Sequence, residues 1–243
     1  MPVETDSLIA HLADEGVRLA SATGAAGWEV PVPRTDWTIR ELVTHVGGVH
    51  RWAADVVRRG AADLTTPLGL AVGQGPPDEE LLRWYREGHE ALVAALRDAP
   101  SDLAAGTFLP APSPRHFWAR RQAHETAIHR ADADAACGVT AVFDPAFAQD
   151  GIAELLQGFA ARKPGPALGG TLTLRCTDGL SWVVDLGGDR VSATPVPDVD
   201  HGDVSGSSSD VYLWAWNRDS PAKVDDAQPG VRWWPDAVTV TWS

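Results

Sequence analysis

The sequence predicts an α+β protein, in which a helical bundle fills the first two thirds of the chain and a small α+β domain follows. Apolar residues recur at helical spacing up to the Lys-Pro-Gly-Pro run at 163–166, which interrupts regular structure. After that run, short stretches rich in Thr, Val and Leu flank the hairpin signal at 178–179, Asp-Gly. We therefore expect two domains, residues 1–163 and residues 164–243.

The helical part divides into four long helices and a shorter fifth. Leucines recur at roughly helical spacing between Leu8 and Leu19, which predicts the first helix over residues 4–22. The second, over about 36–59, is expected to begin after a cap at Thr35 or Asp36. Further helices are expected over about 78–97, 115–137 and 145–161, with a loop rich in Gly and Pro over 61–77.

The last part of the chain reads as strands with one helix. Strands are expected over 171–176 and 181–186, joined by the Asp-Gly turn, and a third over 190–194. The serines within 205–209 are suited to cap a helix, and the alternating residues 238–242 predict a closing strand.

Composition and charge narrow the classes of partner and location. The 243 residues carry a net charge of −13, with 33 acidic and 20 basic side chains and no basic cluster beyond short pairs. A nucleic-acid or anionic membrane surface is therefore not an expected partner. The acidic N-terminus lacks the features of a signal peptide, and no apolar run reaches the ~20 residues of a membrane span. The two cysteines form no disulfide framework, so we expect a cytoplasmic protein.

The most informative residues are Glu125 and His129. They are four apart, so on a helix their side chains meet on one face, and Asp132 lies three further on near that face. A carboxylate oxygen and an imidazole nitrogen supply half of a metal site, and His45, among apolar neighbours in the second helix, is the best third ligand. Such a set leaves one position open for water or a substrate atom, as catalytic sites do.

The same residues also fit interpretations in which they bind no metal. Glu125 and His129 would form an ordinary surface pair, and His45 would be a hydrogen-bonded core histidine. Arg121 and Asp132 would contact a cofactor or ligand carboxylate, orient a metal ligand, or form a structural ion pair. The residues alone leave these alternatives open.

Two stretches together resemble a known family. Residues 37–45, Trp-Thr-Ile-Arg-Glu-Leu-Val-Thr-His, and residues 121–132, Arg-Gln-Ala-His-Glu-Thr-Ala-Ile-His-Arg-Ala-Asp, look like the mycothiol-dependent maleylpyruvate isomerase family, a branch of the DinB-like metalloenzymes. The resemblance covers nearly the whole chain. It implies a DinB-like four-helix bundle that binds zinc through His45, Glu125 and His129, followed by a small C-terminal α+β domain.

The resemblance also implies a basic residue of the active site in the C-terminal domain. The family carries it in a Leu-Trp-Gly-Arg-like stretch, and the matching stretch here, residues 210–218, makes Arg218 the candidate. Asn217 replaces the usual Gly, so the local backbone conformation and the substrate can differ from those of the family. The implied thiol cosubstrate is mycothiol, which adds to a small unsaturated dicarboxylate and leaves after rotation, giving cis–trans isomerisation.

Several readings remain beside isomerisation. The same scaffold suits a mycothiol S-transferase acting in detoxification, because the ligands that activate a thiol look alike whichever electrophile it meets. A non-catalytic metal-containing binding protein and a hydrolase using metal-bound water are further alternatives. Nickel or iron would suit two imidazoles and a carboxylate nearly as well as zinc. The expected partners are a small electrophile and a low-molecular-weight thiol, and the chain is expected to be a monomer or homodimer.

Overall fold

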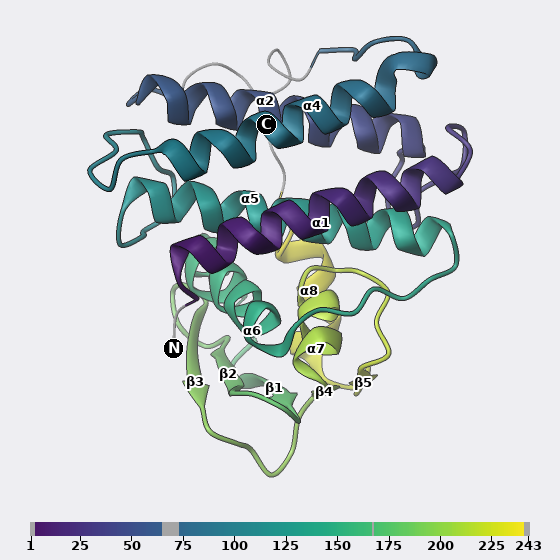
Figure 1. Ribbon diagram of the computed structural model, residues 1–243. Helices are drawn as coiled ribbons and strands as arrows, with labels where there is room; N and C mark the ends of the chain where they lie inside the picture. The colour runs from purple at the N-terminus through teal and green to yellow at the C-terminus, as the bar shows by residue number, and fades with distance from the viewer. Residues whose placement is uncertain (1–2, 65–72, 167, 241–243) are drawn as a thin grey trace. The chain divides into compact units, whose positions relative to one another are not determined.

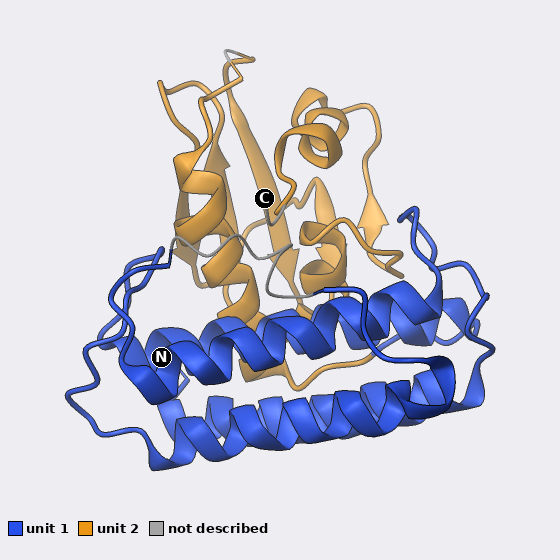
Figure 2. Ribbon diagram, turned by 90° about the horizontal axis from the view of Figure 1, so that it is seen from above, with its two compact units in different colours: residues 1, 3–141, 242–243 blue, residues 2, 142–241 orange. Residues whose placement is uncertain are grey.

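The structure, a computed structural model, describes residues 3–64, 73–166 and 168–240 (Figure 1). These form two compact units that divide in sequence between Ala141 and Val142 (Figure 2). The Lys-Pro-Gly-Pro run at 163–166 lies inside the second unit. Part of the expected loop at 61–77 falls on residues 65–72, outside the described residues.

The first unit is a four-helix bundle, as the sequence predicts. Its helices are α1 (Thr5–Ala25), α2 (Ile39–Arg59), α4 (Asp78–Asp98) and α5 (Pro114–Ala136), which run alongside one another in Figure 1. Helix α1 packs against α5 and α4, and α2 packs against α4 and α5. The α2–α5 pairing matters for function, because α2 carries His45 and α5 carries Glu125 and His129.

The start of α2 differs from the prediction. The cap is Thr38, not Thr35 or Asp36. The Thr38 hydroxyl accepts a hydrogen bond from the Glu41 backbone N–H, and the Glu41 carboxylate accepts one from the Thr38 N–H at 2.7 Å. This reciprocal pair satisfies two backbone donors at once, which favours Thr38 over the earlier candidates.

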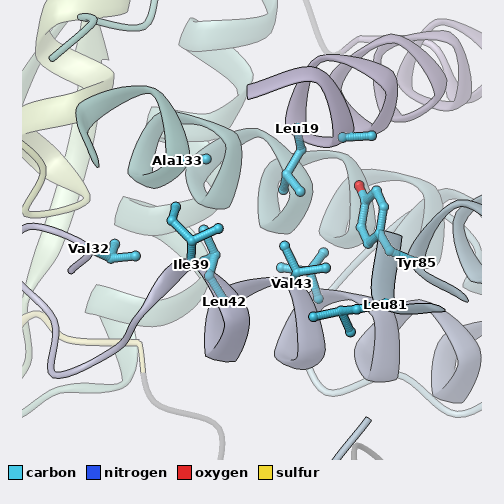
Figure 3. Close-up of a cluster of buried hydrophobic side chains, with 10 residues drawn as sticks. Leu19, Val32, Ile39, Leu42, Val43, Leu81, Tyr85 and Ala133 are labelled. Carbon is cyan, nitrogen blue, oxygen red and sulfur yellow. The ribbon is translucent and has the colours of Figure 1, made fainter. Parts of the chain in front are cut away.

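The bundle holds together through an apolar core drawn from all four helices. Ile39, Leu42 and Val43 of α2 lie in one cluster with Leu19 of α1 and Leu81 of α4, and all five are fully buried (Figure 3). Full burial of each such side chain contributes about 1.5–3 kcal/mol to folding. Leu42 and Val43 belong to this core and directly precede Thr44 and His45, so their packing fixes the turn of α2 that carries His45.

The second unit is an α+β unit built on a five-stranded sheet. Its helices are α6 (Pro145–Ala153), which continues as a π-helical stretch (Glu154–Phe159) and a 3₁₀ turn (Ala160–Arg162), α7 (Ser208–Ala215) and α8 (Pro229–Ala237). Its strands are β1 (Thr171–Cys176), β2 (Ser181–Asp185), β3 (Ser192–Val196), β4 (Val204–Gly206) and β5 (Lys223–Val224). The strand order is β3-β2-β1-β4-β5, with β1 and β4 parallel and the other pairs antiparallel.

Several expectations for this unit need correction. The third strand begins at Ser192 rather than at residue 190, and strands β4 and β5 and helix α8 were not expected. Helix α8 contains Pro235, a residue that normally argues against a helix interior. The expected closing strand is wrong where it is described, because residues 238–240 are not in a strand, and its last residues lie outside the described part. Among the described helices, none is long and apolar enough to span a membrane.

Candidate metal centre

The three expected ligands converge where α2 packs against α5. Oε1 of Glu125 lies 3.4 Å from Nε2 of His45 and 3.2 Å from Nε2 of His129. The three ligand atoms lie within 4.8 Å of one another. Two imidazoles and a carboxylate at this spacing are the donors that a divalent cation such as zinc uses. The residues present therefore fit the metal that the fold family implies.

The centre is nearly closed, with its more open side at His45. The side chains of His45, Glu125 and His129 are 15%, 4% and 10% exposed. The Trp37 ring packs 4.7 Å from the His45 ring and 5.7 Å from the His129 ring, measured between centroids. A surface pocket of about 620 Å³ adjoins His45, and Trp37, Arg40, Glu41, Thr44 and residues 73–77 complete its lining.

Asp132 orients one of the candidate ligands. Its Oδ2 atom lies 2.9 Å from Nδ1 of His129, and the carboxylate is buried. A carboxylate accepts but does not donate, so Nδ1 of His129 carries a hydrogen. Nε2, the atom that faces Glu125 and His45, is then the nitrogen that binds a metal once it has lost its own proton. This is the arrangement in which an outer carboxylate fixes the tautomer of a metal-binding histidine.

Arg121 holds the other α5 ligand. Its Nη2 donates to Oε2 of Glu125 at 3.3 Å, one turn along the helix, and both side chains are buried. The guanidinium occupies one carboxylate oxygen while the other, Oε1, faces the two histidines. Arg121 and Asp132 thus each contact a candidate ligand.

The pKa values of the α5 pair reflect these contacts. Burial favours the neutral form of Glu125, but hydrogen bonds from His129 and His45 outweigh it and hold the pKa of that carboxyl well below its usual range. Burial likewise lowers the pKa of His129, but hydrogen bonds to Asp132 and Glu125 and the charges of both carboxylates outweigh it and raise the pKa to about 9. The metal-free site therefore holds a carboxylate and an imidazolium near neutral pH.

This raised pKa gives the centre a defined pH dependence. A metal must displace the His129 proton, so the apparent zinc affinity is expected to rise about tenfold per pH unit between roughly pH 7 and 9 and then level off. The stability of the metal-free protein should instead fall as pH rises. The folded-state pKa of His129 lies above the unfolded value of about 6.5, so the contribution of His129 to stability is complete below that pH and is lost as pH rises through 9. Zinc titration calorimetry and thermal unfolding over this interval test both trends.

Replacing Asp132 by Asn should weaken metal binding without removing a ligand. The amide cannot match the carboxylate as an acceptor for Nδ1 of His129, so the zinc affinity should fall about 10- to 100-fold. Competition with a chromogenic chelator measures this loss. An unchanged affinity in Asp132→Asn would show that the His129 contact has no part in metal binding.

Arg218 belongs to the second unit, just after α7. Its backbone N–H donates to the Leu213 carbonyl at 2.9 Å, and its Nη1 donates to the Trp216 carbonyl at 2.7 Å. Asn217 before it has a φ of 60°, in the left-handed region that Gly and Asn tolerate best. Asn in place of the family's usual Gly therefore keeps a local backbone conformation that Gly also accepts.

Two features near the centre were not predicted from the sequence. Trp37 belongs to the stretch that resembles the family, yet the packing of its ring against both histidine rings was not expected. His50 lies on another face of α2 from His45 and contacts Thr126 of α5, with its Nε2 2.8 Å from Oγ1 of Thr126. Such interior contacts depend on helix packing and leave no mark in residue spacing.

Comparisons with known proteins identify the family and the fold of the chain. The Mycothiol maleylpyruvate isomerase N-terminal domain family matches residues 9–134. No curated protein matches the chain in sequence. Solved structures of the mycothiol-dependent maleylpyruvate isomerase and of a histidine-to-alanine variant each superpose with a TM-score of 0.63 at 16% identity, over 90% of this chain and 91% of theirs, which shows a shared fold. Because the family match spans more than half of the sequence, the chain belongs to the mycothiol maleylpyruvate isomerase family.

Proposed function

We propose that this protein is a metal-dependent enzyme that activates a low-molecular-weight thiol for the cis–trans isomerisation of a small unsaturated dicarboxylate. The observation that carries the proposal is the convergence of His45, Glu125 and His129, whose ligand atoms lie within 4.8 Å of one another. Three protein ligands leave a fourth position for a substrate atom, whereas structural zinc sites are closed by four.

Zinc is the proposed metal, and nickel or iron would accept the same ligands. When bound, the cation would lower the pKa of a thiol so that it reacts as the thiolate. The chain's own residues prepare the site: Asp132 directs Nε2 of His129 inward, and Arg121 holds Glu125. The Trp37 ring shields both histidines on one side, which strengthens electrostatic interactions there.

The proposed reaction proceeds by addition, rotation and elimination. The thiolate sulfur forms a bond to one carbon of the substrate double bond, and the displaced electron pair moves onto the conjugated carbonyl as an enolate. The former double bond, now single, rotates. The enolate then reforms the double bond and the carbon–sulfur bond breaks, which returns the thiolate and the trans product. In this proposal Arg218 binds a substrate carboxylate through its guanidinium.

The thiol that we assign is mycothiol, on which the structurally similar isomerase depends. The direct test is turnover of maleylpyruvate by the zinc-loaded protein with and without mycothiol. We expect turnover only when both are present, and its loss in His129→Ala.

The same assay separates the competing functions. Conjugation of alkyl halides or epoxides to the thiol, without isomerisation, would identify an S-transferase on this scaffold. Hydrolysis without any added thiol would indicate a hydrolase, and stable metal binding with no thiol-dependent turnover would indicate a binding protein. Each of these three results would overturn the isomerase proposal.

A further inference from the structure

Gln122 on α5 has a buried side chain whose polar atoms find no partner in the part of the chain that the structure describes. It is 0% exposed, and neither Nε2 nor Oε1 has a hydrogen-bond partner among the described residues. Its backbone carbonyl, by contrast, accepts from Oγ1 of Thr126 at 2.7 Å. A buried polar group without a partner costs stability, and an apolar side chain of the same shape would avoid that cost. A fully unpaired carboxamide therefore points to a ligand that pairs with it.

The position of Gln122 places it beside the metal centre. It lies three residues before Glu125 and seven before His129, so it projects within about 20° of the His129 direction, in the first unit. One helical turn, about 5.4 Å, separates it along α5 from Glu125 and Thr126. The other polar side chains of this face all have partners: Glu125 and His129 contact each other, and Thr126 contacts His50.

The chemistry of a carboxamide narrows the ligand. Its nitrogen donates two hydrogen bonds and its oxygen accepts, so it is fully paired only by a group that offers both an acceptor and a donor. A carboxylate would satisfy the donor half alone. An amide, with its own carbonyl and N–H, satisfies both halves and is neutral, as suits a fully buried position.

We propose that Gln122 binds the amide group of the thiol substrate while the sulfur occupies the open position beside His45, Glu125 and His129. This inference rests on the proposed function, because it takes the ligand to be a thiol. In such a thiol two carbons separate the sulfur from the amide nitrogen, and one helical turn of about 5.4 Å separates Gln122 from Glu125 along α5. The pocket of about 620 Å³ adjoins His45, on the more open side of the centre, and is the entry that this proposal assigns to the thiol.

Two small thiols form a matched pair of probes. N-acetylcysteine and 3-mercaptopropionate share a thiol and a carboxylate, and only the first carries an acetamido group. Cobalt(II)-substituted protein reports thiolate binding through a sulfur-to-metal charge-transfer band. We expect the wild-type protein to prefer N-acetylcysteine by about tenfold relative to Gln122→Met, a factor that corresponds to about 1.4 kcal/mol. Comparing the two proteins removes intrinsic differences between the two thiols.

Stability supplies an independent readout with a matched control. Gln122→Met should raise the melting temperature of the ligand-free protein by about 2–6 °C, because it removes the unpaired carboxamide. In Gln149, on α6, the carboxamide nitrogen donates to the Leu180 carbonyl and to Oγ of Ser208, each at 3.0 Å. The same substitution there should lower the melting temperature and leave the thiol preference unchanged.

The outcomes distinguish this inference from the proposed function. A charge-transfer band with both thiols but an equal preference in wild type and Gln122→Met overturns the role of Gln122 alone. A lowered melting temperature in Gln122→Met would show a structural partner and would also overturn it. Absence of the band with either thiol overturns the thiol-dependent function, and this inference falls with it.

Discussion

Zinc should raise the melting temperature of the metal-free protein by about 5–10 °C, and His129→Ala should abolish that shift. A ligand present at a hundred times its dissociation constant stabilises the folded state by about 2.7 kcal/mol. In a chain of this size that free energy corresponds to a rise in melting temperature of about 5–10 °C. His129 supplies one of three ligand atoms within 4.8 Å of one another, and alanine leaves only two. Differential scanning fluorimetry with and without zinc measures the effect.

The matched control is His201→Ala. His201 is exposed, belongs to the second unit and contributes to no described metal cluster, so its loss should leave the full shift in place. A zinc shift of the same size in His129→Ala as in wild type would mean that the metal binds elsewhere.

The second large effect concerns the ion pair that ties α1 to α5. Arg130→Met should destabilise the metal-free protein by about 3–5 kcal/mol, because it removes the buried partner of the Glu15 carboxylate and leaves only the exposed Arg18, 3.5 Å away. Nε of Arg130 donates to Oε2 of Glu15 at 2.7 Å, and Nη1 donates to Oδ2 of Asp134 at 2.7 Å. The side chains of Arg130 and Glu15 are 4% and 6% exposed, so bulk water compensates little for the lost guanidinium. Urea denaturation gives the change in free energy of unfolding.

The control for this prediction is the exposed pair of Arg59 and Asp55 on α2. Their side chains are 63% and 55% exposed, and Arg59→Met should cost no more than about 1 kcal/mol. Equal losses in Arg130→Met and Arg59→Met would show that burial of the α1–α5 pair adds nothing to stability.

The sequence predicted the bundle because each long helix carries its own signal. Apolar spacing and cap residues are local, so helices α1, α2, α4 and α5 were expected within a few residues of their observed ends. Strands β4 and β5 and helix α8 are short, and their formation depends on neighbours in the sheet and its packing. Local spacing carries little information about such elements.

The residues of the candidate site also differ in how far local spacing could predict them. Glu125 and His129 were paired by their spacing on one helix, which needs no tertiary information. His45 is 80 residues away from Glu125. Its apolar neighbours made it a candidate ligand, and the family resemblance implied that the second helix brings it to Glu125 and His129. That the Gln122 side chain has no partner among the described residues appears only when its surroundings are known, because nothing in the sequence shows which polar atoms packing leaves unpaired.

The most direct measurement is the metal stoichiometry of protein prepared without chelators and then titrated with zinc. We predict one tightly bound divalent metal per chain, and its loss when His45 or His129 is replaced by alanine. No bound metal, together with no saturable zinc binding by the wild-type protein, would contradict a metal centre at His45, Glu125 and His129.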